Sequence, residues 1–143
     1  MTSPITKRRL VASELVPLVI LLGLGCKYYR GPGADWMNNW GPASVAYELL
    51  FMLLAFIVVP RRDAIRKIAN GVLLGTCLVE FLQLWKPSFL EAIRATLAGR
   101  LVLGTSFSWW DFPAYVVGCL LGVFLLRGIC SIPVKEESSI HLE

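Results

Sequence analysis

The sequence predicts an all-α integral membrane protein, a bundle of four transmembrane helices. Of its 143 residues 56% are hydrophobic and only 17% are charged, and the mean hydropathy of +0.64 is far above that of a soluble domain. Lys and Arg bracket the apolar runs, as they do at the ends of membrane spans. Four spans of roughly 20 residues would use about 80 residues and leave room only for short connections. We therefore expect one transmembrane domain, 1–130, and a disordered polar tail, 131–143.

The first predicted span covers residues 10–26, after Lys7, Arg8 and Arg9. A basic start followed by an apolar run is also typical of a secretory signal peptide. No A-x-A cleavage motif follows, and the glycines before Cys26 do not match a lipidation site. We therefore expect this segment to remain in the protein as a helix.

The second and third predicted spans flank a basic loop. Residues 27–40 form a loop rich in Tyr and Trp, which prefer the membrane–water boundary. Span two follows at 41–59 and begins with Pro42, which is tolerated in a first helical turn. Residues 60–67 carry four basic side chains and precede span three at 68–85.

Between spans three and four the chain is too charged to cross lipid. Ser88 and Glu91 have the spacing of a capping box, which predicts a helix from Phe89 that ends at Gly99. We expect a short amphipathic or re-entrant helix at the outer boundary. Span four then covers 111–126.

The distribution of basic residues predicts the orientation, because cytoplasmic loops collect Lys and Arg. Of the 14 basic residues, nine fall on one side and five on the other, so both termini are expected in the cytoplasm. The nine are Lys7, Arg8, Arg9, Arg61, Arg62, Arg66, Lys67, Arg127 and Lys135, and the five are Lys27, Arg30, Lys86, Arg94 and Arg100.

Polar residues inside spans are costly and mark candidate functional positions. We expect one cluster in the outer half of the bundle, made of Glu48, Glu80, Gln83, Arg94, Arg100, Asp111 and Tyr115. In one interpretation the arginines neutralise the acids and only stabilise the packing. In another they bind a phosphate or carboxylate while a carboxyl group acts as acid or base. Proton or ion coupling is the third.

Other kinds of site find no support. The single histidine, His141, lies in the tail, and the four cysteines are scattered in apolar runs, so no zinc site, metal, cofactor or Ser/His/Asp set is expected. No basic face with stacking aromatics suggests a nucleic-acid partner. The pairs Gly71/Gly75 and Gly118/Gly122 would let helices approach closely, either within the bundle or with a membrane protein partner.

Several rare polar positions together resemble known families. The motif from Glu80 to Gln83, then Arg100, then residues 104–111 and Tyr115 is similar to the VanZ-like membrane proteins, and more closely to the DUF2809 family of small bacterial membrane proteins. Residues 27–36 also resemble the DUF2809 version. One departure is Tyr115, where VanZ-like proteins often carry Asn.

This resemblance implies a protein of the bacterial inner membrane but no known reaction. For VanZ itself it implies a role in resistance to teicoplanin, which for this chain is an analogy from fold. We expect an envelope-related role in which the polar cluster binds a lipid-linked or anionic component, in contact with membrane lipid. A structural subunit or assembly factor, and an enzyme acting on a lipid-linked or phosphorylated substrate, are the alternatives. The sequence assigns no catalytic residue.

Overall fold

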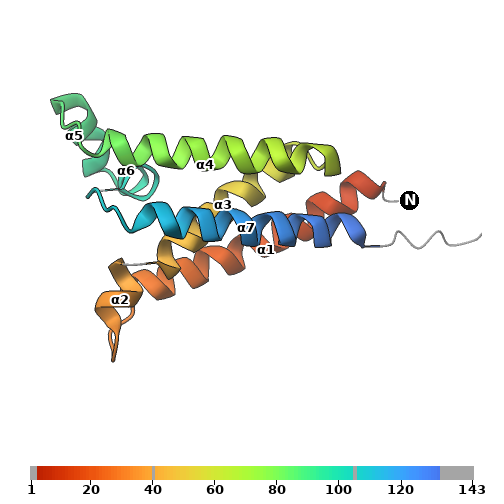
Figure 1. Cartoon of the computed structure of the whole chain (residues 1–143), viewed down its shortest axis with the longest axis horizontal. Helices are drawn as coiled ribbons and strands as arrows, with labels where there is room; N and C mark the ends of the chain where they lie inside the picture. The colour runs from red at the N-terminus through yellow and green to blue at the C-terminus, as the bar shows by residue number, and fades with distance from the viewer. Residues whose placement is uncertain (1–2, 40, 105, 133–143) are drawn as a thin grey trace, which may run out of the picture.

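The structure, a computed structural model, describes residues 3–39, 41–104 and 106–132, and every regular element within these ranges is a helix. The all-α expectation is therefore confirmed. The long helices run along the long axis of the molecule in Figure 1; they are α1 (Pro4–Tyr28), α3 (Pro42–Val58), α4 (Ile65–Leu82) and α7 (Asp111–Ser131). The short helices α2 (Ala34–Asn39), α5 (Ser88–Ala95) and α6 (Leu97–Leu103) lie at the same end of the bundle, and η1 (Arg62–Ala64) lies at the other.

Three stretches are long and apolar enough, by length and composition, to cross a membrane: Pro4–Tyr28, Asp111–Ser131 and Ala34–Val58, the last of which contains α2 and α3 on either side of a residue that the structure does not describe. Their outward faces carry large exposed apolar side chains, such as Leu21 and Phe124. Because such continuous apolar surface is unfavourable in water, it fits contact with lipid. The helix α4 has 18 residues, but its three charged side chains keep it outside this class by composition.

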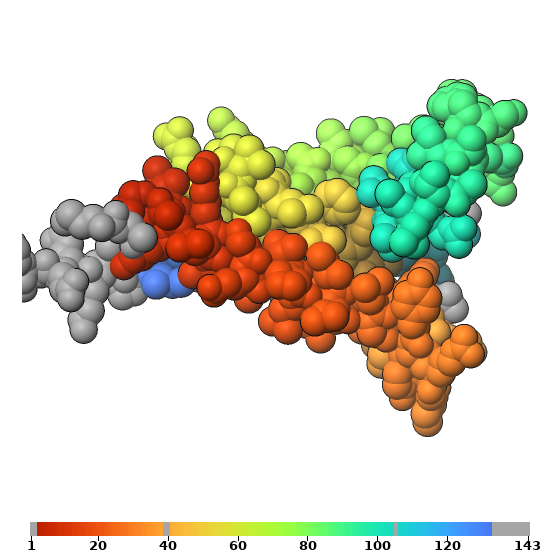
Figure 2. All heavy atoms as spheres, turned by 180° about the vertical axis from the view of Figure 1, so that it is seen from behind, coloured from red at the N-terminus to blue at the C-terminus, as the bar shows by residue number. Residues whose placement is uncertain are grey.

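The helix α3 lies at the centre of the bundle. Its largest interface is with α1, the next is with α7, and α4 packs against both α7 and α3. Figure 2 shows α1 lying across one face, with α2 and the α5–α6 segment projecting apart at the same end. The fully enclosed members of the apolar core, which include Ala12, Met52, Phe56 and Leu126, lie toward the end where α1 begins and α3 and α7 end.

The two glycine pairs have different surroundings. A Cβ atom on Gly118 would lie 2.8 Å from the Cβ of Glu48 and 3.0 Å from the carbonyl oxygen of Val45, and one on Gly122 would overlap the Met52 sulfur. These glycines allow the α7 backbone to approach α3. Gly71 and Gly75 on α4 have no heavy atom within 4 Å of such a position, so their face meets no other described helix.

The predicted helix boundaries need correction. The helix α1 begins at Pro4, because Ser3 caps it by accepting a hydrogen bond from the Thr6 amide at 3.2 Å. The segment 27–40 is not entirely loop, since it contains α2. The last long helix does not stop at Arg127 but continues to Ser131. Trp40, Thr105 and the tail from 133, which includes Lys135 and His141, lie outside the described residues.

The predicted capping box is wrong. Ser88 is already helical, Pro87 occupies the N-cap position, and no side chain caps α5. The chain breaks at Thr96, which has extended backbone angles and whose hydroxyl accepts from the Gly99 amide at 3.0 Å to cap α6. Gly99 does not end a helix; a Cβ there would overlap the carbonyl group of Ile93. Glycine is required at this point because α5 and α6 turn tightly against one another.

Replacing Gly118 with alanine should destabilise the bundle by about 1–3 kcal/mol, because the new methyl group meets backbone that cannot move aside. Gly71→Ala is the matched control, since the added methyl group meets nothing and alanine favours helix by up to about 1 kcal/mol. Unfolding of both variants in detergent measures the difference. Equal stability of the two variants would show that α3 and α7 do not approach as described.

Candidate functional site

Three carboxyl side chains gather at the end of the bundle where α3 and α7 begin and α4 ends. Glu48 lies in the second turn of α3, Glu80 lies in the last turn of α4, and Asp111 is the first residue of α7. We call these residues the carboxyl cluster. Glu48 and Glu80 are fully enclosed, each with 0% of its surface exposed, and Asp111 is half-buried.

Glu80 is hydrogen-bonded through both of its oxygens. The Ser108 amide donates to Oε1 at 2.7 Å, and the Tyr115 hydroxyl donates to Oε2 at 3.1 Å. Tyr115 is itself buried and lies one turn into α7. Glu80 therefore joins the end of α4 to the segment before α7 and to α7 itself.

Asp111 extends this network toward the surface. Its Oδ1 accepts a hydrogen bond from the Ser44 hydroxyl at 2.7 Å, which links α7 to the first turn of α3. The carboxyl groups of Asp111 and Glu80 also interact directly. Lys27, at the end of α1, acts on Asp111 only through its charge and forms no ion pair with it in the described residues.

Glu48 has no hydrogen-bond partner at either oxygen among the described residues. The Thr76 side chain lies near it, but the Thr76 hydroxyl donates to the carbonyl oxygens of Val72 and Leu73 in its own helix, at 3.1 and 3.0 Å. Buried polar groups in proteins are almost always satisfied, so Glu48 is an exception that needs an explanation.

The two arginines expected in the cluster lie outside it. The Arg94 guanidinium donates to the carbonyl oxygens of Leu82 at 2.8 Å and Trp85 at 3.3 Å, and so satisfies the exposed end of α4. Arg100 is exposed and forms no ion pair with any described residue. Within the described ranges the one ion pair joins Arg61 and Asp63, at 3.5 Å, and it lies at the opposite end of the bundle.

Arg94 and Arg100 instead line an open cleft beside the α5–α6 segment. Its walls are Lys86, Glu91, Arg94, Ala95 and Arg100, and its volume is about 320 Å³. Three cations and one acid make this cleft positively charged, so we call it the basic cleft. Lys86 and Arg100 are exposed at this cleft, whereas Glu48 and Glu80 of the carboxyl cluster are enclosed by the bundle.

Gln83 lies at the edge of the carboxyl cluster, below the segment that returns from α6 to α7. It is 7% exposed, and its Oε1 has no partner in the described part of the chain. Gly104, with a φ of 65°, passes so close that a Cβ there would overlap the Gln83 amide.

The hydroxyl of Tyr47 donates to the carbonyl oxygen of Val102 at 2.5 Å. The α6 segment is thus attached to α3.

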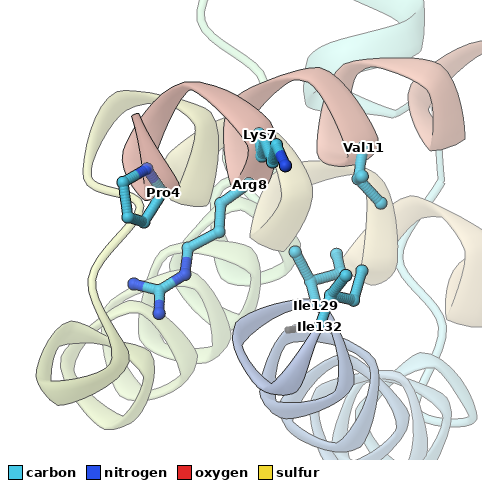
Figure 3. Close-up of a pocket in the computed structure, with 6 residues that line it drawn as sticks. All are labelled: Pro4, Lys7, Arg8, Val11, Ile129 and Ile132. Atoms are coloured by element: carbon cyan, nitrogen blue, oxygen red, sulfur yellow. The ribbon is translucent and has the colours of Figure 1, made fainter. Parts of the chain in front are cut away.

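A second, smaller pocket lies at the other end of the bundle. Figure 3 shows the side chains of Lys7 and Arg8 on α1 near the apolar Ile129 on α7. Its volume of about 20 Å³ is enough for a water molecule but not for a ligand. Arg8 donates to the carbonyl oxygen of Cys130 at 3.3 Å, which ties α1 to the end of α7.

Sequence reasoning missed three contributors to these sites. Ser44 could have been found, since it lies four residues before Glu48 and so shares its helix face. Ser108 contributes its backbone amide, for which a side-chain pattern carries no signal. Lys86 was counted only as an outer basic residue. No group of three or more His, Cys, Asp or Glu side chains in the described ranges is arranged to hold a metal ion.

Residues 33–119 match the family model described as protein of unknown function DUF2809. The chain belongs to the DUF2809 family. The matched range runs from just before α2 to the middle of α7, so it includes every residue of the carboxyl cluster and of the basic cleft. In this DUF2809 chain the first span and the end of α7 lie outside the match. No solved structure matches the chain.

Tyr115→Phe should lower the free energy of unfolding by about 1–3 kcal/mol, because it leaves a buried oxygen of Glu80 without its donor. Tyr28→Phe is the control: Tyr28 is 68% exposed, so loss of its hydroxyl should change stability by less than about 0.5 kcal/mol. Chemical unfolding of both variants in detergent makes the comparison. A Tyr115→Phe variant as stable as Tyr28→Phe would contradict the described contact.

Proposed function

We propose that this DUF2809 protein is a four-span protein of the bacterial inner membrane that binds an anionic, lipid-linked component of the cell envelope at the basic cleft. The observation that carries the proposal is the cleft itself, in which Lys86, Arg94 and Arg100 surround a volume of about 320 Å³. Basic side chains in such an arrangement suit a phosphate or carboxylate. The similarity to VanZ-like proteins supports an envelope-related role by analogy.

The fourth span in this proposal is α4. It lies alongside α3 and α7, and its 18 residues are within the length that a membrane helix needs. Its charges do not oppose this assignment. Arg66 and Lys67 lie in its first turn, where long side chains reach the interface, and Glu80 is enclosed by the bundle.

The orientation follows from the two ends of the bundle. The described basic residues of the larger group all lie at the end where α1 begins and α7 ends, and those of the smaller group lie near α2, α5 and α6. Basic residues mark the cytoplasmic side. Both termini are then cytoplasmic, and the basic cleft opens on the outer side.

The α5–α6 segment suits a position at the outer interface without crossing the membrane. Phe89, Ile93 and Leu97 are exposed, while Lys86 and Arg94 line the cleft. Trp85 and Phe89 are in edge-to-face contact, with ring centroids 5.8 Å apart, and aromatic side chains favour this depth. A ligand in the cleft would have its acyl chain in lipid and its charged group among the cations.

The basic side chains of the cleft have different roles in this proposal. Arg94 is held by the carbonyl groups at the end of α4, so it contributes charge from a fixed position. Lys86 and Arg100 are exposed and have no ion pair in the described residues, so they are available for a ligand. Glu91 is the acidic residue that lines the cleft. If the protein were an enzyme acting at this cleft, Glu91 would be the candidate general acid or base.

A structural subunit remains a second candidate because of one observation. Gly71 and Gly75 lie on α4 with no heavy atom near them, and Leu74 and Leu78 beside them are exposed. Small residues four apart allow another helix to pack closely. This face of α4 could therefore receive a helix of another membrane protein.

Removing the free cations should weaken binding without damaging the fold. Lys86→Gln and Arg100→Gln should each lower the affinity for phosphatidic acid about tenfold, or ~1.4 kcal/mol, through loss of a charge-assisted contact. Titration of the detergent-solubilised protein measures the affinity, and thermal unfolding should show no change.

Arg62→Gln is the matched control, since Arg62 is an exposed cation at the other end of the bundle. The affinity of the Arg62→Gln variant for phosphatidic acid should equal that of the parent protein. Neither protein should bind diacylglycerol, which has no phosphate. If Arg62→Gln lowered the affinity for phosphatidic acid as much as Arg100→Gln, the net charge of the protein, and not the cleft, would attract the lipid.

Cysteine probes can test the orientation in intact cells. A membrane-impermeant thiol reagent should modify cysteine at the exposed positions Asp35 and Ser88, and should reach Asp63 only after the cells are permeabilised, because a charged reagent does not cross lipid. The parent chain with its four native cysteines, which lie within helices, measures the background. The opposite pattern of labelling would reverse the assigned orientation.

A further inference from the structure

The unpartnered carboxyl group of Glu48 is not used by the proposed binding at the basic cleft. Glu48 lies between α4 and α7, with Thr76 near it on one helix and Gly118 against its Cβ on the other. Its exposed fraction is 0%, and neither oxygen has a hydrogen-bond partner among the described residues.

Among the described residues, the groups around Glu48 supply no positive charge. Its charge acts on side chains from its own helix and from both helices packed beside it. The side chains on which its charge acts are Tyr47 on α3, Cys77 on α4 and Cys119 on α7. The other titratable groups of this polar region are Glu80 on α4, and Tyr115 and Asp111 on α7. On the α1 side, Gly23 packs against Ala46, and Lys27 acts on Asp111. The neighbours of Glu48 are therefore neutral or acidic.

An ionised carboxylate cannot be kept in such a place. Burial of a charge without a partner is far more costly than burial of a neutral acid, and the surrounding lipid adds no compensation. A bound cation would remove the cost, but a metal ion or an ammonium group needs room beside the oxygens, and the described side chains enclose Glu48 completely. A proton needs no volume beyond the carboxyl group itself.

We propose that Glu48 is a proton-binding site, a carboxylic acid that holds its proton while the bundle is closed. Release requires the packing of α4 and α7 around Glu48 to loosen, since water otherwise does not reach the enclosed carboxyl group. On loosening, the Glu48 O–H bond breaks, the proton passes to an entering water molecule, and a hydrated carboxylate remains. The protonation of Glu48 is thereby coupled to the packing of α4 and α7.

Infrared spectroscopy of the purified full-length protein at neutral pH tests the proposal. A protonated carboxylic acid has a carbonyl-stretching band that a carboxylate lacks. The wild type should show this band, Glu48→Gln should lose its Glu48 component, and Glu80→Gln should retain that component. Asp63→Asn is the control, because Asp63 is exposed and paired with Arg61, so the band should be unchanged.

Thermal unfolding gives the second readout. Glutamine replaces a neutral acid with a neutral group of the same shape, so Glu48→Gln should keep the melting temperature of the wild type. The proposal is wrong if the band is absent from the wild type, if Glu48→Gln leaves it intact, or if Glu48→Gln fails to fold because the negative charge was required. Failure of phosphatidic acid binding at the cleft would not affect any of these results.

Discussion

The carboxyl group of Glu80 holds the polar end of this protein together. It accepts one hydrogen bond from a backbone amide before α7 and another from a tyrosine within α7. Because Glu80 is fully enclosed, water cannot replace these donors, and the chain has to supply them. The segment after α4 must therefore return to the end of the helix that it left. The positions of α5, α6 and the start of α7 all depend on that return.

Opposite charges are separated at this end by the length of their side chains. Glu and Asp are short and stay between the helices, where hydroxyl and amide groups of neighbouring helices reach them. Arg94 is long enough to lie over the end of α4 and bond to its last carbonyl groups, and Arg100 extends outward. The result is an acidic interior and a basic rim. The proposed anion binding and the proposed proton binding use different groups at the same end.

The two halves of the bundle differ in the kind of side chain that they bury. The half with Met52, Phe56 and Leu126 is apolar and closely packed, which is where helix packing in lipid gains its stability. The other half contains the enclosed polar groups, including oxygens of Glu48 and Gln83 that have no hydrogen-bond partner in the described part of the chain. Gly118 connects the two halves, since the same close approach that packs α7 on α3 also seals Glu48 from water.

The sequence by itself determined the helical class, the apolar stretches of α1, α3 and α7, the start of α3 at Pro42 and the family. These properties depend on composition and on residues close together in the chain, such as a proline in a first turn or an apolar run between cations. The resemblance rested on motifs from Glu80 to Tyr115, which lie inside the matched range, and on residues 27–36, of which the matched range includes 33–36.

Only the tertiary structure decided which residues meet. Gly71/Gly75 and Gly118/Gly122 have the same spacing, yet only the second pair touches another helix. Helical spacing tells which side chains share a face, but not which element that face meets. For the same reason the sequence placed Arg94 and Arg100 among the acids. The sequence also did not identify Ser108, which contributes a backbone amide that every residue except proline carries. Such an amide acquires a specific role only when the fold brings it to a buried acceptor.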